Sequence, residues 1–138
     1  MKASKWMTVL ALSTLTGCGL YESVVGVPMA AAVVQAPPAT SMDRVFQCAE
    51  TSVKRLAQPD SFWRSDVTRR DHDEGILETG DFGKANVGGF RARITFDKRT
   101  NEIRIDLKGA GAYYKDIGVE KSVADLKNEM QGCLQARA

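Results

Sequence analysis

The clearest pattern in this chain is a strict alternation of apolar and polar residues in two neighbouring runs, 90–97 and 103–108. A polar stretch at 98–101 separates them, so the pattern predicts an antiparallel hairpin with one buried and one exposed face. The apolar positions are Phe90, Ala92, Ile94, Phe96, Ile103, Ile105 and Leu107. The charged positions between them are Arg91, Arg93, Arg104, Asp106 and Lys108, which form either a solvated face that discourages edge pairing or a binding face.

Apolar residues recur at the helical spacing of three and four positions on both sides of this hairpin. This spacing predicts one helix over roughly 41–57, capped by Thr40 or Ser41 and ended by Gln58-Pro59. A second helix is expected to begin near Val119 or at Ser122, where Asp125 would complete a capping box. The apolar stripes are Met42, Val45, Phe46, Ala49, Val53 and Leu56 in the first helix, and Val123, Leu126, Met130, Cys133 and Leu134 in the second.

The segment between the first helix and the hairpin carries weaker signals. A strand is expected from Trp63 to Thr68, and another at 76–79 before the turn at 80–83. These elements predict an α+β fold of two layers, in the order helix, antiparallel meander of three or four strands, helix. Both helices need cover, so we expect them side by side on the apolar face of the sheet, in a single domain over 41–138.

The first eighteen residues have a different organisation. A basic start at Met1–Lys5 precedes an apolar run from Trp6 to Leu15, and the run ends in Leu15-Thr16-Gly17-Cys18. This ending resembles the lipobox of bacterial lipoproteins. The resemblance implies that 1–17 is a signal peptide, that acylated (palmitate-bearing) Cys18 becomes the N-terminus, and that the partner of this end is the lipid bilayer. Gly19 is not the Asp that retains enteric-type lipoproteins at the inner membrane, so the resemblance implies the outer membrane, facing the periplasm.

The next stretch, 18–40, is expected to be a flexible tether that follows the lipidated cysteine. Pro28, Pro37 and Pro38 and the alanine run 30–32 argue against a long regular element. A coil of about twenty residues has a root-mean-square reach of about 25 Å. The apolar residues 24–27 and 33–34 leave a second reading open, in which part of this stretch rests on lipid or on a partner.

The balance of basic and acidic residues, and the number of cysteines left to pair, both change when the signal peptide and the lipidated cysteine are left out of the count. Lys2 and Lys5 leave with it, so the 19 basic residues become 17, against 17 acidic ones. No electrostatic argument for a nucleic-acid partner survives. With Cys18 assigned to lipid, Cys48 and Cys133 remain as a pair in an exported chain, which predicts a disulfide rather than a reactive or metal-binding pair. Its closed loop of 85 positions would stabilise the fold by roughly 4–5 kcal/mol.

Chemistry-bearing residues are sparse. His72 is the only histidine and lies within Asp71-His72-Asp73-Glu74, which is either a solvated polar loop or a weak metal or acid–base candidate. Consecutive loop residues do not easily converge on one ion, and the chain has no HExxH, GxSxG or phosphate-binding glycine motif. We therefore expect no catalytic, metal or cofactor site.

Two functions remain after these exclusions. The first is a non-catalytic interaction or adaptor module that docks on an envelope protein through an exposed aromatic patch at Phe62-Trp63 or Tyr113-Tyr114. The second is a module that binds a small ligand or the cell wall, or inhibits an envelope-acting enzyme. That role would need a concave pocket with converging polar groups between helices and sheet. Trp63 is expected in the core.

Overall fold

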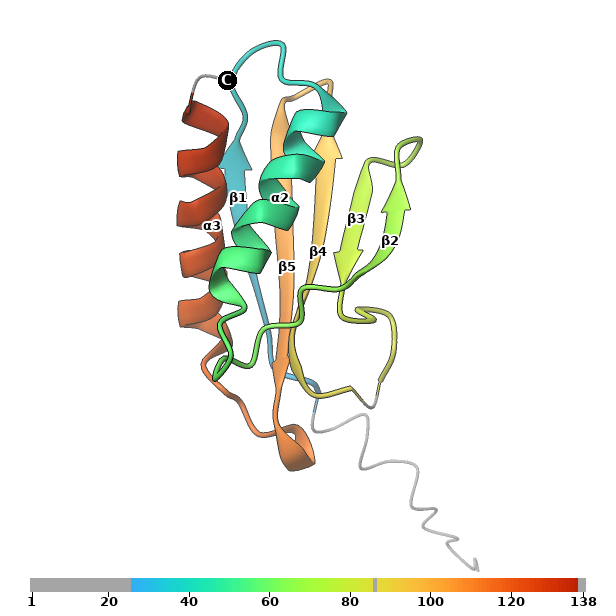
Figure 1. Cartoon of the computed structure of the whole chain (residues 1–138). Coiled ribbons are helices and arrows are strands. Elements are labelled where there is room, and N and C mark those ends of the chain that lie inside the picture. Colours follow the sequence, from blue (N-terminus) through green and yellow to red (C-terminus); the bar gives the residue numbers. More distant parts are fainter. Residues whose placement is uncertain (1–25, 86, 137–138) are drawn as a thin grey trace, which may run out of the picture.

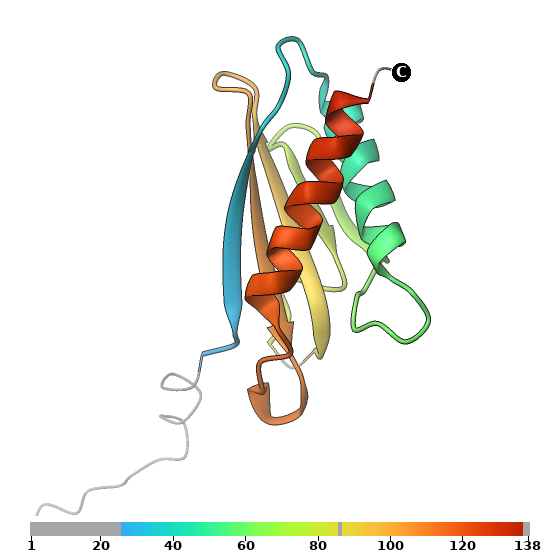
Figure 2. The ribbon, with the colours of Figure 1, turned by 90° about the vertical axis from the view of Figure 1, so that its left-hand side faces the viewer.

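The computed structural model describes residues 26–85 and 87–136. They form a five-stranded antiparallel sheet with two helices against one of its faces (Figures 1 and 2). The predicted α+β fold, with both helices on one face, is therefore confirmed. The elements are β1 (Met29–Gln35), α2 (Met42–Leu56), β2 (Val67–Asp71), β3 (Ile76–Thr79), β4 (Gly89–Asp97), β5 (Glu102–Ala110), the 3₁₀ turn η2 (Ala112–Tyr114) and α3 (Val119–Gln135). In space the strands follow the order β1-β5-β4-β3-β2.

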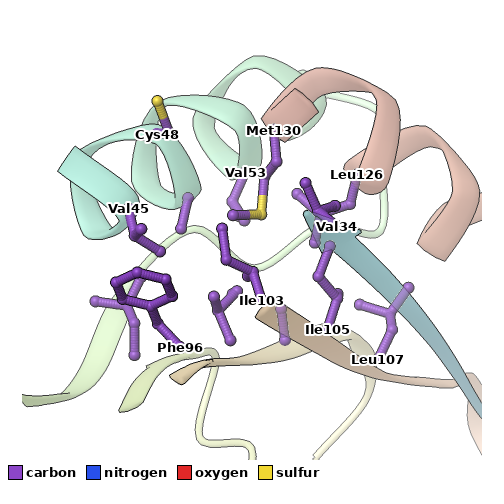
Figure 3. Close-up of a cluster of buried hydrophobic side chains, with 14 of the residues drawn as sticks. Val34, Val45, Cys48, Val53, Phe96, Ile103, Ile105, Leu107, Leu126 and Met130 are labelled. Atoms are coloured by element: carbon purple, nitrogen blue, oxygen red, sulfur yellow. The ribbon is translucent and has the colours of Figure 1, made fainter. Parts of the chain in front are cut away.

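The alternating runs form the centre of the sheet as predicted. β4 and β5 pair in a register that sets Ile94 opposite Ile105, and all the apolar positions of both strands face the helices. Figure 3 shows Ile103, Ile105 and Leu107 beneath side chains of α2 and α3, and Val34 of β1 beside them. This layer of aliphatic side chains is the hydrophobic core.

The strand β1 corrects the predicted tether. Residues 29–35 are not a spacer, because they pair with β5 along their whole length and bury Ala30 and Val34 under α3. The folded domain thus begins at least as early as Met29, not at Ser41, and the sheet has one strand more than the largest number expected. The flanking prolines bracket the strand and do not interrupt it, so they are compatible with a ladder. The signal peptide, Cys18 and the rest of the tether up to residue 25 lie outside the described residues.

Both helices begin with side-chain caps, one of them unexpected. The Ser41 hydroxyl accepts a hydrogen bond from the Arg44 N–H, as predicted for α2. α3 begins at Val119, and the carboxylate of Asp116 accepts hydrogen bonds from the N–H groups of Val119 (3.0 Å) and Gly118 (2.8 Å). These bonds lower the pKa of Asp116 from its ordinary value of 3.8. The expected capping box is wrong, because Ser122 lies buried inside the first turn.

A disulfide joins the two helices. Cys48, in the middle of α2, is bonded to Cys133, near the end of α3, with 5.6 Å between their Cα atoms. The predicted pairing is confirmed. The closed loop contains β2, β3, β4 and β5, and β1 is the one strand outside it. Among the described residues no helix is long and apolar enough to cross a membrane.

Candidate functional site

The two aromatic pairs that the sequence singles out meet at one end of the sheet. The first pair reaches it through a short extended segment after α2. The Phe90 N–H donates to the Phe62 carbonyl (2.8 Å), and the Arg64 N–H donates to the Phe90 carbonyl (3.1 Å), so residues 62–64 run beside the start of β4. Only Trp63 bridges to the sheet here, and the strand expected over 63–68 instead begins at Val67.

Phe62 and Trp63 occupy different environments. The Trp63 ring packs on Phe90 with 5.2 Å between ring centroids and is partly buried against the core. Phe62 lies edge-on to Phe90 at 6.5 Å and keeps 60% of its surface exposed. Gly89, with φ of +93°, allows this approach, since a Cβ there would lie 2.6 Å from the Phe62 carbonyl oxygen. Trp63 is therefore partly buried against the edge of the core, which agrees only in part with the expected core position, and Phe62 beside it lies on the surface.

The second pair lies on a closed loop between β5 and α3. The Gly111 N–H donates to the Lys115 carbonyl (2.8 Å), and the Lys115 N–H donates to the Ala112 carbonyl (3.2 Å), which fixes the loop around its tip. At the tip Tyr113 and Tyr114 both have positive φ, 55° and 58°, and Tyr113 is 99% exposed. Left-handed backbone at non-glycine residues costs of order 1–3 kcal/mol each and is concentrated at functional sites.

Together the two pairs line an open pocket of about 770 Å³. Four aromatic residues line it, Phe62, Trp63, Tyr113 and Tyr114, together with the glycines Gly88, Gly89 and Gly111. Arg64 is the charged residue in the lining, and Ser61 also contributes to it. A largely apolar hollow of this size, bordered by aromatic rings and a few polar groups, is suited to an inserted apolar side chain or a small amphipathic ligand.

The lining residues of the pocket belong to the start of β4, the end of β5 and the loops beside them, at the end of the sheet where β1 begins. Figure 1 shows these elements and the start of β1 at the same end of the sheet. β1 begins at Met29 opposite Lys108, and the Gly109 N–H donates to the Pro28 carbonyl (3.0 Å). The pocket residues Ala110 and Gly111 follow directly. Ten residues lie between Cys18 and Met29 in the sequence, and a fully extended chain spans at most about 40 Å over those positions.

His72 lies in the turn between β2 and β3, at the other end of the sheet from this pocket (Figure 1). Its Nε2 is 3.0 Å from a carboxylate oxygen of Asp43, and its ring meets that of Phe46 edge-on at 5.0 Å. Asp71 accepts the N–H groups of Asp73 and Glu74 and so holds the turn. Within residues 26–85 and 87–136 no group of three histidine, cysteine or acidic side chains is placed to hold a metal ion.

The charged face of the hairpin departs from the expected solvated ladder. The exposed Arg104 side chain pairs with the half-buried Asp106 at 2.8 Å. The loop at 80–84 covers the other end of the face, where the Lys108 Nζ donates to the Phe82 carbonyl. There the Phe82 ring is held between two cations, with the Arg93 guanidinium carbon 4.5 Å and the Lys108 Nζ 4.4 Å from its centroid. Burial lowers the pKa of Lys108, as do, to a lesser degree, the neighbouring arginine charges.

Beneath the same loop Arg91 is fully buried, which is the sharpest departure from the sequence pattern. The Arg91 Nη1 donates one hydrogen bond to the Lys84 carbonyl (2.6 Å). Nε and Nη2 have no hydrogen-bond partner in the described part of the chain. Burial, followed by repulsion from Arg64, lowers the pKa of Arg91, and Asp81 partly offsets this. The face is thus partly covered, and Arg91 is a charge inside the protein.

Comparison with protein-family models, curated proteins and solved structures finds no match for this chain.

Proposed function

We propose that this protein is a lipid-anchored, non-catalytic interaction module of the bacterial cell envelope that holds a partner protein in its aromatic pocket. The observation that carries the proposal is the convergence of Phe62-Trp63 and Tyr113-Tyr114, fifty positions apart in sequence, on one open hollow. Large aromatic side chains in a desolvated pocket are typical energetic centres of protein interfaces.

Two features of the pocket favour a partner with an apolar anchor. The exposed side chains Phe62 and Tyr113 flank a hollow whose remaining lining is largely glycine, alanine and aromatic carbon. Tyr113 is held outward by a left-handed backbone that costs free energy in the unbound protein. An inserted aliphatic or aromatic side chain would cover both rings, and Arg64 in the lining would be available for a polar contact.

The lipobox resemblance and the position of the pocket support the anchored role. Acylated Cys18 would bind the bilayer, and the pocket includes Ala110 and Gly111, which follow the β5 residues that pair with Pro28 and Met29 at the start of the described chain. The helix-to-helix disulfide fits an oxidising compartment such as the periplasm. We place the protein at the outer membrane, facing the periplasm, on the basis of Gly19. Metabolic labelling with a fatty acid tests the anchor: Cys18→Ser should carry no label, and a labelled variant would refute the lipobox assignment.

The non-catalytic role is supported by where the reactive side chains are used. Cys48 and Cys133 are bonded to each other, and His72 contacts Asp43 and Phe46 away from the pocket. The competing function, in which the hollow binds a small ligand or the cell wall, needs converging polar groups. The lining offers Arg64, Ser61 and the tyrosine hydroxyls for that purpose.

A photo-crosslinking experiment from the pocket distinguishes the partner-protein function from the ligand-binding or cell-wall-binding function. A photoreactive phenylalanine analogue in place of Phe62, in the lipidated chain in its own membranes, should yield one discrete crosslinked protein. Tyr113→Ala should reduce its yield by about tenfold or more, as expected for an interface centre. The control variant Val67→Ala alters an exposed apolar residue that lies on β2, outside the pocket lining, and should leave the crosslink yield unchanged. A crosslink to glycan alone, or no difference between the two variants, would overturn the partner-protein proposal.

A further inference from the structure

β1 is an edge strand whose outer backbone groups have no strand beside them within the described residues. The Ala36 N–H donates to the Asn101 carbonyl and the Pro28 carbonyl accepts from Gly109, so even-numbered residues point to β5. In an antiparallel ladder the residues between them direct their N–H and C=O groups the other way. Those residues are Met29, Ala31, Val33 and Gln35. Figure 2 looks onto this side of the molecule and shows β1 and α3 next to each other.

The two edges of the sheet are not alike. β2, the other edge, is five residues long, contains Arg69, Arg70 and Asp71, and has a register irregularity after Val67. Short length, charge and bulges are the devices by which edge strands avoid pairing with other chains. β1 is seven residues long, carries no charge and contains no proline or register shift. Met29 and Val33 remain 50% and 45% exposed on it.

We propose that β1 is a homodimer interface, in which two copies of this chain pair antiparallel through β1 to make one continuous ten-stranded sheet. The register is centred on Ala32, so that residues 29, 31, 33 and 35 of one copy face 35, 33, 31 and 29 of the other. All of these residues direct their backbone groups outward, so the four pairs exchange about eight hydrogen bonds.

Side-chain sizes favour a second copy over an unrelated strand. In this register each Val33 faces Ala31 of the other copy and each Val34 faces Ala30, so both valines meet an alanine, while Met29 faces Gln35 at the two ends of the strand. The central pair is Ala32 against Ala32, at the closer, non-hydrogen-bonded spacing of about 4.5 Å between Cα atoms. No charge on β1 opposes its own copy. The strand is therefore complementary to itself.

The dimer is compatible with the proposed pocket and does not depend on it. No residue of β1 lines the pocket, so pairing through β1 leaves the lining residues uncovered by the paired strand in both copies. The antiparallel register offsets the two Met29 residues by six positions, or about 20 Å along the strands. The ten residues between Cys18 and Met29 on each copy are long enough, when extended, to span that separation, so both anchors can reach one bilayer.

Proline at Val33 tests the interface without touching the ladder to β5, because the Val33 N–H points outward. In sedimentation of the full mature chain, the parent and Val33→Thr, which keeps the N–H and the shape, should be dimeric. Val33→Pro, with its far-UV circular dichroism unchanged, should dissociate at least tenfold more readily. A monomeric parent at all concentrations, or a Val33→Pro dimer as tight as the parent dimer, would overturn the proposal.

A crosslink measures the register directly and does not need the proline variant. Ala32→Cys, oxidised in its own membranes, should form a reducible dimer, because the paired Cα atoms lie within disulfide range. Val33→Cys should not, although Val33 is more exposed, because its two copies are offset by two positions and stand beyond about 7 Å. The parent chain controls for the native cysteines. Equal crosslinking of the two variants, or none in Ala32→Cys, would refute this register.

Discussion

The disulfide between Cys48 and Cys133 gives a prediction whose magnitude follows from the topology. The bond closes a loop of 85 positions that contains every strand except β1. In the chain-entropy model such a closure removes about 4.5 kcal/mol of conformational freedom from the unfolded chain at 25 °C. A domain of this size has a total stability of about 5–15 kcal/mol, so loss of the bond should lower the melting temperature by about 20 °C.

The test compares two ways of opening the loop in a chain that lacks residues 1–18 and is exported by another signal. One is the double variant Cys48→Ala, Cys133→Ala, and the other is the parent reduced with dithiothreitol. Urea unfolding, followed by the fluorescence of Trp63, gives the free energy of each. Both should lose about 4.5 kcal/mol relative to the oxidised parent. The small difference between them measures the packing of the sulfur atoms, since Cys48 is fully buried.

The outcome also tests where the stabilisation arises. If the bond acts on the unfolded state, the dependence of the free energy on urea should steepen without it, because the open chain exposes more surface. A loss below about 2 kcal/mol by both routes would refute the entropy argument. It would mean that the contacts between α2 and α3 hold the two helices together unaided.

Two further substitutions test the charged face and the start of α3. Arg91→Met should raise the free energy of unfolding, measured by urea titration, by about 1–2 kcal/mol. The substitution replaces a buried charge that lacks two of its hydrogen bonds with an apolar side chain of similar length. A variant less stable than the parent would contradict this prediction. Asp116→Ala should lower the melting temperature at pH 7, because the lowered pKa means that the carboxylate form stabilises the fold above the ordinary carboxyl range. That contribution is lost as the pH falls through the lowered pKa of Asp116. The difference in melting temperature between the parent and Asp116→Ala, measured over a pH series, should therefore shrink below about pH 4. A difference that stays constant with pH would refute the capping role of Asp116.

Sequence pattern alone predicted much of this architecture because the decisive signals are local. Alternation from Phe90 to Phe96 depends only on the two-residue period of a strand, and it assigned the buried face of the central hairpin correctly. The helix stripes worked in the same way. They also placed Cys48 and Cys133 on helices that share a sheet face, which made their bond predictable.

Tertiary structure decided what depends on partners far along the chain. β1 is uncharged and rich in alanine, and it becomes a strand because β5, about seventy positions later, supplies its hydrogen bonds and α3 covers Ala30 and Val34. Arg91 has the alternation of an exposed residue and is buried because the loop at 80–84 folds over it. The aromatic pairs were visible in the sequence, but only the joining of the two loops beside Gly89 forms a pocket. Local periodicity determines which face of an element is apolar, and long-range pairing determines what that face meets.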